Sequence, residues 1–380
     1  MARVILGTPS APLVVLSFGL AAAAASGCAP GATRGQPNPG LPAASAPIQP
    51  VVKSATVPHD PDDPAIWIHP TDPSKTLVLG TDKQEVAGGL YAFRLDGSLS
   101  QSIPALDRPN NVDVEYGFRT ADGQIDIAAL TERKQHRLRV FGISRDNGTL
   151  HDIAPAGLPV LEGLTGEASE PMGIALYKRP KDGAIFAIVA PKTGEATDYL
   201  WQYRLEAAAV GQVTATLVRR FGRFSQNGEI EAVVVDDELG YVYYSDETWG
   251  IRKYHADPDH PDAALELATF GRDGYEGDRE GLAIYARGDR TGFLVSADQV
   301  SRRSRLKLYP REGAAGQAHE HPELRTLLTV SDATDGLEVT STPLPGFPQG
   351  LLVMMNSAGK NFLIYDWRTV MPPTTSTTER

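Results

Sequence analysis

The sequence predicts an all-β fold, a six-bladed β-propeller, and three observations lead to it. A tetrapeptide that begins with a large apolar residue and ends with an aromatic one recurs six times, at intervals of 48 to 62 residues. Two further apolar runs of strand length precede each tetrapeptide, and long amphipathic helical patterns are absent. A repeat of about 50 residues with several short strands is typical of propeller blades. A β-sandwich with accidental regularity is the alternative.

The six units follow one another along the chain, each with three visible strands and space for a fourth at its outer side. Their first runs are AIWI, VDVEY, GIALY, AVVVDD, GLAIYA and GLEVTS. Their second runs are LVLGT, DIAAL, FAIVA, YVYYS, FLVSA and LLVMM. The closing tetrapeptides begin at Leu90, Leu138, Leu200, Ile251, Leu306 and Phe362. These units predict one propeller domain over residues 52–368.

Both ends of the chain are predicted to lie outside the propeller. Residues 1–27 contain one basic residue, an apolar run over 11–25 and small residues before Cys28, which is typical of an export signal. The run is shorter than a membrane span. The segment is similar to a bacterial lipobox, which would make Cys28 a lipidated first residue, with Ala25 in place of the usual Leu. A plain secretory signal is the alternative.

Composition indicates where the protein is located and argues against one class of binding partner. Residues 28–51 are rich in Pro, Gly and Ala and predict a flexible tether, and residues 369–380 predict a disordered tail. We expect an exported protein, either a cell-envelope lipoprotein of the periplasm or outer membrane, attached only through its lipid, or a secreted one. The net charge of −11 argues against binding nucleic acid, which needs basic patches. We expect a monomer, and the single cysteine rules out an internal disulfide.

A polar residue opens the first strand of every unit. The first strand of each propeller blade lines the central channel, so these six residues should form a ring at one mouth of it. They are Asp63, Asn111, Glu170, Glu231, Glu280 and Asp335. Hard oxygen ligands of this kind suit Ca²⁺. The eight histidines are spread along the sequence and predict no zinc site.

The second strand of each unit should return to the same mouth, because it runs antiparallel to the first. In the first three units it ends at Lys83, Arg133 and Lys192. In the fourth and fifth it ends at further acids, Asp246-Glu247 and Asp298. The mouth is therefore predicted to have a cationic half and a metal-binding half. Lys and Arg bind phosphate, and metal with Lys or Arg disperses the charge of phosphoryl transfer.

The segments DDPAIW, NNVD, IEAVVVDDE, SDE, DREGL and TDGLEV resemble the β-propeller phytases, the alkaline, Ca²⁺-dependent 3-phytase family, over nearly all of residues 52–367. The resemblance implies several Ca²⁺ ions and phosphate-binding bases at Lys83, Arg133 and Lys192. It implies Ca²⁺ ligands at Asp62, Asp63, Asn110, Asn111, Glu231, Glu247, Asp278, Glu280 and Asp335. Met172 and Gln84 depart from the family pattern, where Tyr and Lys are frequent, and the loop before Asp335 is short.

The expected activity is release of phosphate from phytate by direct attack of metal-activated water. The chain has no Arg-His-Gly run for a histidine nucleophile, and its one cysteine is at the processing site. We expect Glu231, Asp62, Asp63 and Glu280 to carry the reaction through bound Ca²⁺. Because the protein is acidic, the expected substrate is the Ca²⁺ complex of phytate. A propeller lactonase or esterase with a channel Ca²⁺ and a non-catalytic binding propeller are the alternatives.

Overall fold

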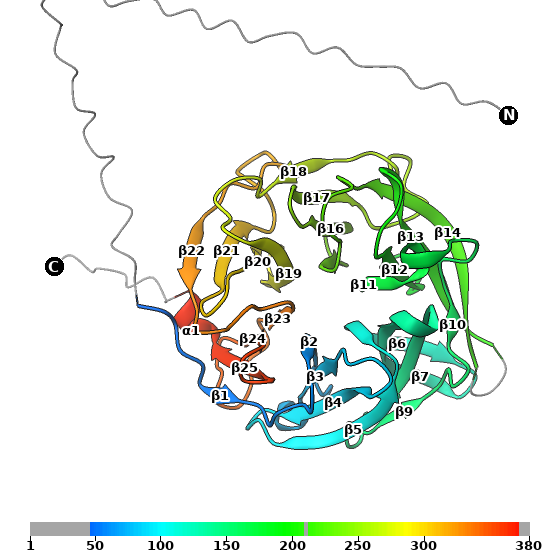
Figure 1. Ribbon diagram of the computed structural model, residues 1–380, viewed down its shortest axis with the longest axis horizontal. Helices are drawn as coiled ribbons and strands as arrows, with labels where there is room; N and C mark the ends of the chain where they lie inside the picture. Colours follow the sequence, from blue (N-terminus) through cyan, green and yellow to red (C-terminus); the bar gives the residue numbers. More distant parts are fainter. Residues whose placement is uncertain (1–45, 209–211, 372–380) are drawn as a thin grey trace, which may run out of the picture. The chain divides into compact units, whose positions relative to one another are not determined.

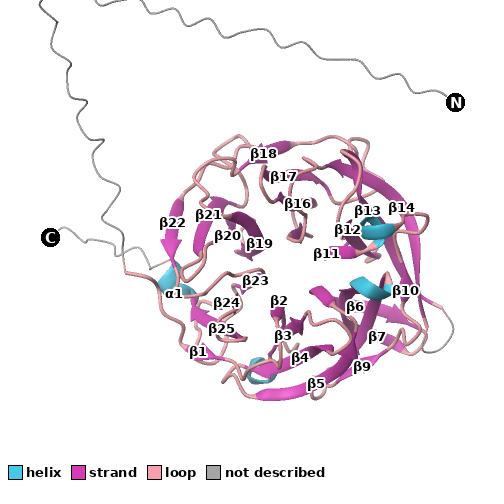
Figure 2. Ribbon diagram, in the orientation of Figure 1, coloured by secondary structure: helices cyan, strands magenta, loops and turns pink. Residues whose placement is uncertain are grey.

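The computed structural model describes residues 46–208 and 212–371 and confirms the six-bladed propeller. Six small antiparallel sheets surround a central channel, with β2, β6, β11, β19 and β23 nearest the centre (Figure 1). Nearly all regular structure is strand (Figure 2). The predicted signal, Cys28, most of the tether and residues 372–380 lie outside the described residues. No helix in the described part of the chain is long and apolar enough to cross a membrane.

The first three blades follow each other along the chain. Blade 1 contains β2 (Pro61–Trp67), β3 (Leu77–Asp82), β4 (Gly88–Arg94) and β5 (Leu99–Leu106). Blade 2 contains β6 (Pro109–Thr120), β7 (Gly123–Glu132), β8 (Arg137–Ile143), β9 (Leu150–Asp152) and β10 (Leu158–Pro159). Blade 3 contains β11 (Pro171–Lys178), β12 (Ile185–Pro191), β13 (Thr197–Ala207) and β14 (Val213–Arg223).

The remaining blades complete the circle. Blade 4 contains β15 (Val233–Asp236), β16 (Tyr241–Asp246), β17 (Gly250–His255) and β18 (Ala268–Phe270). Blade 5 contains β19 (Asp278–Ala286), β20 (Gly292–Gln299), β21 (Arg305–Pro310) and β22 (Arg325–Leu328). Blade 6 contains β23 (Leu337–Thr340), β24 (Leu351–Asn356), β25 (Asn361–Asp366) and β1 (Val52–Lys53). The short helices are η1 (Pro73–Lys75), η2 (Arg133–Gln135), η3 (Gly166–Ser169) and α1 (Trp367–Val370).

Blade 6 closes the ring with strands from both ends of the domain. Strand β1 pairs antiparallel with β25, with Val52 opposite Ile364. The residues just before β1 also join the fold, since Ile48 bridges Thr329. The expected tether is therefore ordered over its last residues. At the other end, Val370 is buried in α1, so the expected tail begins later than residue 369.

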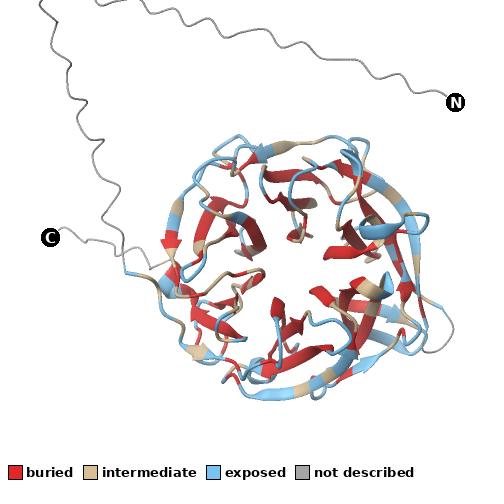
Figure 3. Ribbon diagram, viewed as in Figure 1, coloured by how far each residue is buried: buried red, intermediate tan, exposed pale blue. Residues whose placement is uncertain are grey.

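Hydrophobic packing between neighbouring blades holds the propeller together. Six clusters of buried apolar side chains are found, one between each adjacent pair of blades. The middle of each blade is buried, and exposure is concentrated on outer strands and connecting loops (Figure 3). Because each strand alternates its side chains between the two faces, every blade supplies apolar residues to both neighbours. This packing fixes where the first strand of each blade begins, and hence the positions of the ring residues.

Candidate functional site

Bulges in the first strands shape the mouth of the channel. The strand register shifts between Pro61 and Pro64 in β2, between Pro109 and Val112 in β6, and between Glu280 and Leu282 in β19. A bulge leaves residues out of the ladder and re-aims their side chains. The residues released this way include Asp62, Asp63, Asn110 and Asn111, which the sequence predicted as ligands. A similar shift in blade 3 spans Pro171 to Ile174.

Five of the predicted metal ligands gather at this mouth as one acid cluster, which comprises Asp62, Glu231, Glu247, Glu280 and Asp335. Their charges are close enough to shift one another's pKa values. Burial, followed by the charge of Asp62, raises the pKa of Glu231 well above its usual value. Burial, followed by the charge of Glu231, does the same to the pKa of Glu280.

Two further members of the acid cluster show the same effect. Burial raises the pKa of Asp335 to about 7, with the nearby Lys83 ammonium opposing the rise. Burial also raises the pKa of Glu247 to about 7, although its carboxylate accepts a hydrogen bond from the Glu229 amide. The acid cluster therefore holds more negative charge than its surroundings neutralise, and a cation would relieve this excess.

Lys83 is the one base inside the acid cluster. Its Nζ donates to Asp62 Oδ1 at 2.9 Å and to Asp335 Oδ2 at 2.5 Å. Asp335 also accepts from Gln299 Nε2 at 2.5 Å, a contact that sequence reasoning missed although Gln299 ends a predicted second strand. The charges of Asp62, Asp335 and Glu231 thus act on a single ammonium group.

Two buried oxygens of the acid cluster have no hydrogen-bond partner. They are Asp62 Oδ2 and Glu280 Oε2. An unpaired carboxylate oxygen away from water costs free energy unless a cation or water meets it. The donor set is all oxygen, which suits Ca²⁺ and not the softer metals. The residues present therefore fit a hard cation.

The other four predicted ligands lie outside the acid cluster and make different contacts. Asp63 Oδ2 accepts from the Val112 amide at 3.0 Å and so joins blade 1 to blade 2. Asn110 and Asn111 bond to each other, and Asn110 Oδ1 accepts from Arg133. Asp278 is exposed, yet its charge contributes to the raised pKa of Glu247.

The predicted bases form an arc over blades 1 to 3, which we call the basic arc: Lys83, Arg133 and Lys192. Buried Arg133 donates to Glu170 Oε2 at 3.1 Å, and Lys134, which was not predicted, donates to Glu170 Oε1 at 2.7 Å. Glu170 is thus neutralised and does not join the acid cluster, contrary to the ring prediction. Lys192 Nζ lies 3.2 Å from Glu167 and 3.4 Å from Glu229.

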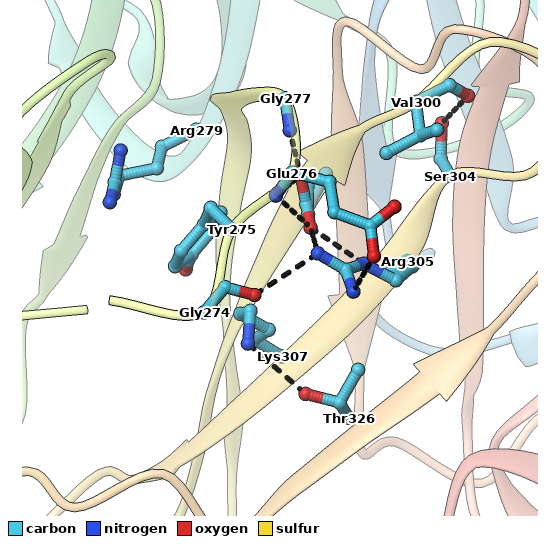
Figure 4. A network of polar contacts seen from close by, with 12 residues as sticks. Gly274, Tyr275, Glu276, Gly277, Arg279, Val300, Ser304, Arg305, Lys307 and Thr326 are labelled. Atoms are coloured by element: carbon cyan, nitrogen blue, oxygen red, sulfur yellow. Dashed lines mark hydrogen bonds and ion pairs between the residues drawn. The ribbon is translucent and has the colours of Figure 1, made fainter. Parts of the chain in front are cut away.

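Two acids expected in the metal-binding half serve the scaffold instead. Asp298 accepts from the Glu276 and Gly277 amides and from Arg305. Figure 4 shows Tyr275 near Arg279 and Lys307, whose cationic groups lie 4.2 and 5.0 Å from its ring centroid. This network holds the loop that leads into β19 and therefore positions Glu280.

Asp246 holds a loop in blade 4 through hydrogen bonds, as Asp298 does in blade 5. Its carboxylate accepts from the Ser225 amide and hydroxyl and from Arg252. Asp246 is fully buried, and these bonds use both of its oxygens. It therefore anchors the loop before the Glu231 position.

The space beneath the mouth is too small for a large substrate. A cavity of about 30 Å³ lies between the first strands, lined by residues that include Asp63, Asp113 and Glu338. That volume suits a water molecule or an ion. A substrate therefore meets the acid cluster and the basic arc from outside, at the open end of the channel.

Comparison with known proteins identifies relatives of the chain. The family model described as Phytase matches residues 23–368. A 3-phytase of Bacillus subtilis (strain 168) is 31% identical over 322 residues, covering 81% of this chain and 80% of the relative.

Two solved structures are more distant. A calcium-binding regucalcin of Agrobacterium tumefaciens str. C58 has a TM-score of 0.47 and 10% identity, over 82% of this chain and 87% of that one. A luciferin-regenerating enzyme has a TM-score of 0.48 and 13% identity, over 83% and 94% of the two chains. At TM-scores below 0.5, these two likenesses say nothing about the chemistry of this chain.

Proposed function

The chain belongs to the phytase family, and on that premise we propose that its acid cluster binds several Ca²⁺ ions and uses them to hydrolyse phytate. It is a phytate-hydrolysing enzyme with a propeller fold, and its family is metal-dependent in general. The observation that carries the Ca²⁺ proposal is the pair of unpartnered buried oxygens on Asp62 and Glu280 inside an all-oxygen acid cluster.

The division of the mouth supports a distinct task for each half. In the proposed reaction Asp62, Glu231, Glu247, Glu280 and Asp335 hold the cations. When bound there, Ca²⁺ would supply positive charge beside the phosphoryl group and would lower the pKa of a water molecule that attacks it. The basic arc binds the phosphate oxygens and neutralises the charge that they carry in the transition state. The products are inorganic phosphate and a lower inositol phosphate.

Lys83 belongs to the basic arc and also contacts two carboxylates of the acid cluster. Without a cation its ammonium pairs with Asp62 and Asp335. If these carboxylates held Ca²⁺, the Lys83 ammonium would be free to donate to a phosphate oxygen.

Electrostatics favours a substrate that brings its own cations. The chain carries a net charge of −11, and phytate is itself strongly anionic. Ca²⁺ bound to phytate removes much of the repulsion between them. We therefore propose the Ca²⁺ complex of phytate as the substrate that the mouth binds. A lactonase or an esterase would have no need of the basic arc, whereas a non-catalytic binding propeller is distinguished by an activity assay.

We also propose that the protein is exported and acts as a monomer, and that Cys28 anchors it to the cell envelope through a lipid. The support is the sequence of residues 1–28. Metabolic labelling with a fatty acid would test the anchor. We expect label in the wild type and none after Cys28→Ala.

The role of the acid cluster is tested with Glu231→Gln. The change keeps the shape of the side chain and removes its charge, so we expect phytate turnover to fall by at least about 100-fold in saturating Ca²⁺ while the fold is retained. Glu206→Gln, an exposed change on β13, is the matched control and should retain wild-type turnover. Near-normal turnover in folded Glu231→Gln would show that Glu231 has no part in catalysis.

A further inference from the structure

A second group of metal-ligating side chains lies far from the acid cluster. In the described part of the chain, one set of three His, Cys, Asp or Glu residues brings its potential ligand atoms within 4.8 Å of one another: His255, His260 and Asp262. This corrects the prediction that the histidines are scattered. We call these three residues the histidine site.

The histidine site lies at the end of blade 4 opposite to the mouth. Strand β16 runs from Tyr241 to Asp246, and Asp246 is next to Glu247 of the acid cluster. His255 pairs with Tyr241, at the other end of that strand. An ion bound at the histidine site would therefore be a strand length away from the acid cluster and the substrate.

Hydrogen bonds from the neighbouring blade hold the loop that carries His260 and Asp262. Arg219, from β14 of blade 3, donates through Nη2 to His255 O at 2.6 Å and through Nη1 to Ala263 O at 2.7 Å. Inside the loop, the Ala263 amide donates to His260 O at 2.9 Å. The bonds from Arg219 hold the two ends of the histidine site together.

The two imidazoles are close and in contact. Their ring centroids lie 3.5 Å apart with an interplanar angle of 19°. The ligand atoms of both rings and of the Asp262 carboxylate lie within 4.8 Å of one another, so the three side chains can reach a common ion.

Binding would change the local hydrogen bonding. The Asp262 amide donates to His260 Nδ1 at 3.1 Å, which leaves the proton of the neutral ring on Nε2. A metal at either nitrogen displaces that hydrogen bond or that proton, and the stacked rings must turn so that both lone pairs meet one ion. The exposed carboxylate of Asp262 supplies negative charge against the nearby Arg219.

We propose that His255, His260 and Asp262 bind one borderline divalent cation of the Zn²⁺ class at the end of the propeller opposite to the acid cluster. Two imidazoles and a carboxylate are ligands that Zn²⁺, Co²⁺ and Ni²⁺ accept, whereas Ca²⁺ takes oxygen ligands. Three protein ligands leave a fourth position for water or for a further side chain. His319 contacts the same Tyr241 ring as His255 but is not one of the three residues whose ligand atoms lie together.

The test is calorimetric titration of the whole protein with Zn²⁺ in excess Ca²⁺, which keeps the acid cluster filled. A parallel Co²⁺ titration reports coordination geometry through its visible absorption. We expect one Zn²⁺ per chain in the wild type and at least about tenfold weaker binding in His260→Ala and Asp262→Asn. The control His151→Ala, an exposed histidine on β9 of blade 2, should bind as the wild type does.

Thermal melting provides a second readout. An ion that binds only the folded protein stabilises it by mass action, so Zn²⁺ should raise the Tm of the wild type and of His151→Ala but not that of His260→Ala. Phytate turnover in saturating Ca²⁺ should be the same in all the variants, which also confirms that they fold. Equal Zn²⁺ affinity in wild type, His260→Ala and Asp262→Asn would overturn the proposal, as would a wild type that binds no Zn²⁺.

Discussion

Replacing Lys83 by methionine should destabilise the metal-free protein far more than the Ca²⁺-bound protein. The side chain is 19% exposed, and its Nζ lies 2.9 Å from Asp62 and 2.5 Å from Asp335. Removing one partner of a buried ion pair costs about 3–5 kcal/mol, because the other charge stays buried and uncompensated. Here two carboxylates lose the same partner, and Glu231 stays close to both.

The cost translates into a measurable shift in Tm. For a domain of this size about 1 kcal/mol corresponds to about 2 °C, so Lys83→Met should lower the Tm in EGTA by about 6–10 °C. In saturating Ca²⁺ the cation supplies the missing charge, and the loss should be less than about half of that. The assay is differential scanning calorimetry of wild type and variant at one scan rate, with EGTA and with Ca²⁺.

A surface lysine provides the control for this comparison. Lys75 is 49% exposed and lies 3.9 Å from Asp72, so Lys75→Met should shift the Tm by less than about 2 °C in either condition. An equal loss of Tm for Lys83→Met in EGTA and in Ca²⁺ would refute the reasoning. It would mean that Ca²⁺ does not take the place of the Lys83 ammonium among the carboxylates.

Three further predictions concern two buried carboxylates and the basic arc. Asp237→Asn should make the stability of the EGTA-treated protein less sensitive to pH. Burial raises the pKa of Asp237 from 3.8 to about 9, so the wild type should lose stability as the pH rises between these values, by at most about 1.4 kcal/mol per pH unit. Urea unfolding at several pH values would show whether that slope persists in the variant. Asp298→Asn should lower the free energy of unfolding by about 3 kcal/mol through the loss of its Arg305 pair, whereas the exposed Asp289→Asn should leave it unchanged. Equal losses for the two variants would contradict the role given to the network in Figure 4. Arg133→Met and Lys192→Met should each raise the KM for phytate about tenfold or more in saturating Ca²⁺, whereas the exposed control Lys181→Met should not. Unchanged KM values would show that the basic arc does not bind the substrate.

The repeat pattern predicted the blades because each first and second strand carries its own apolar run. It also placed Glu231, Glu280 and Asp335 at one mouth, since residues that open equivalent strands meet around the axis. Closure by β1 was not predicted, because two paired residues, Val52 and Lys53, leave no periodic signal. The bulges in β2, β6 and β19 were not predicted either, since they depend on register and not on composition.

The sequence could not reveal which acids find a partner inside the protein. Glu170 is neutralised by Arg133 and Lys134, and Asp298 by Arg305, whereas Glu280 keeps a buried oxygen without a partner. All of these acids stand next to similar strands, so only the three-dimensional contacts separate them. The same holds for His255, whose neighbour His319 lies in the next blade.

Phosphate release from phytate as a function of free Ca²⁺ tests the central claim most directly. The purified protein would be assayed at neutral to mildly alkaline pH, first depleted with EGTA and then titrated with Ca²⁺, with p-nitrophenyl phosphate as the comparison substrate. We predict no release in EGTA, full recovery on adding Ca²⁺, and much weaker hydrolysis of the simple monoester. Undiminished release from phytate in EGTA would contradict the claim that the acid cluster works through bound Ca²⁺.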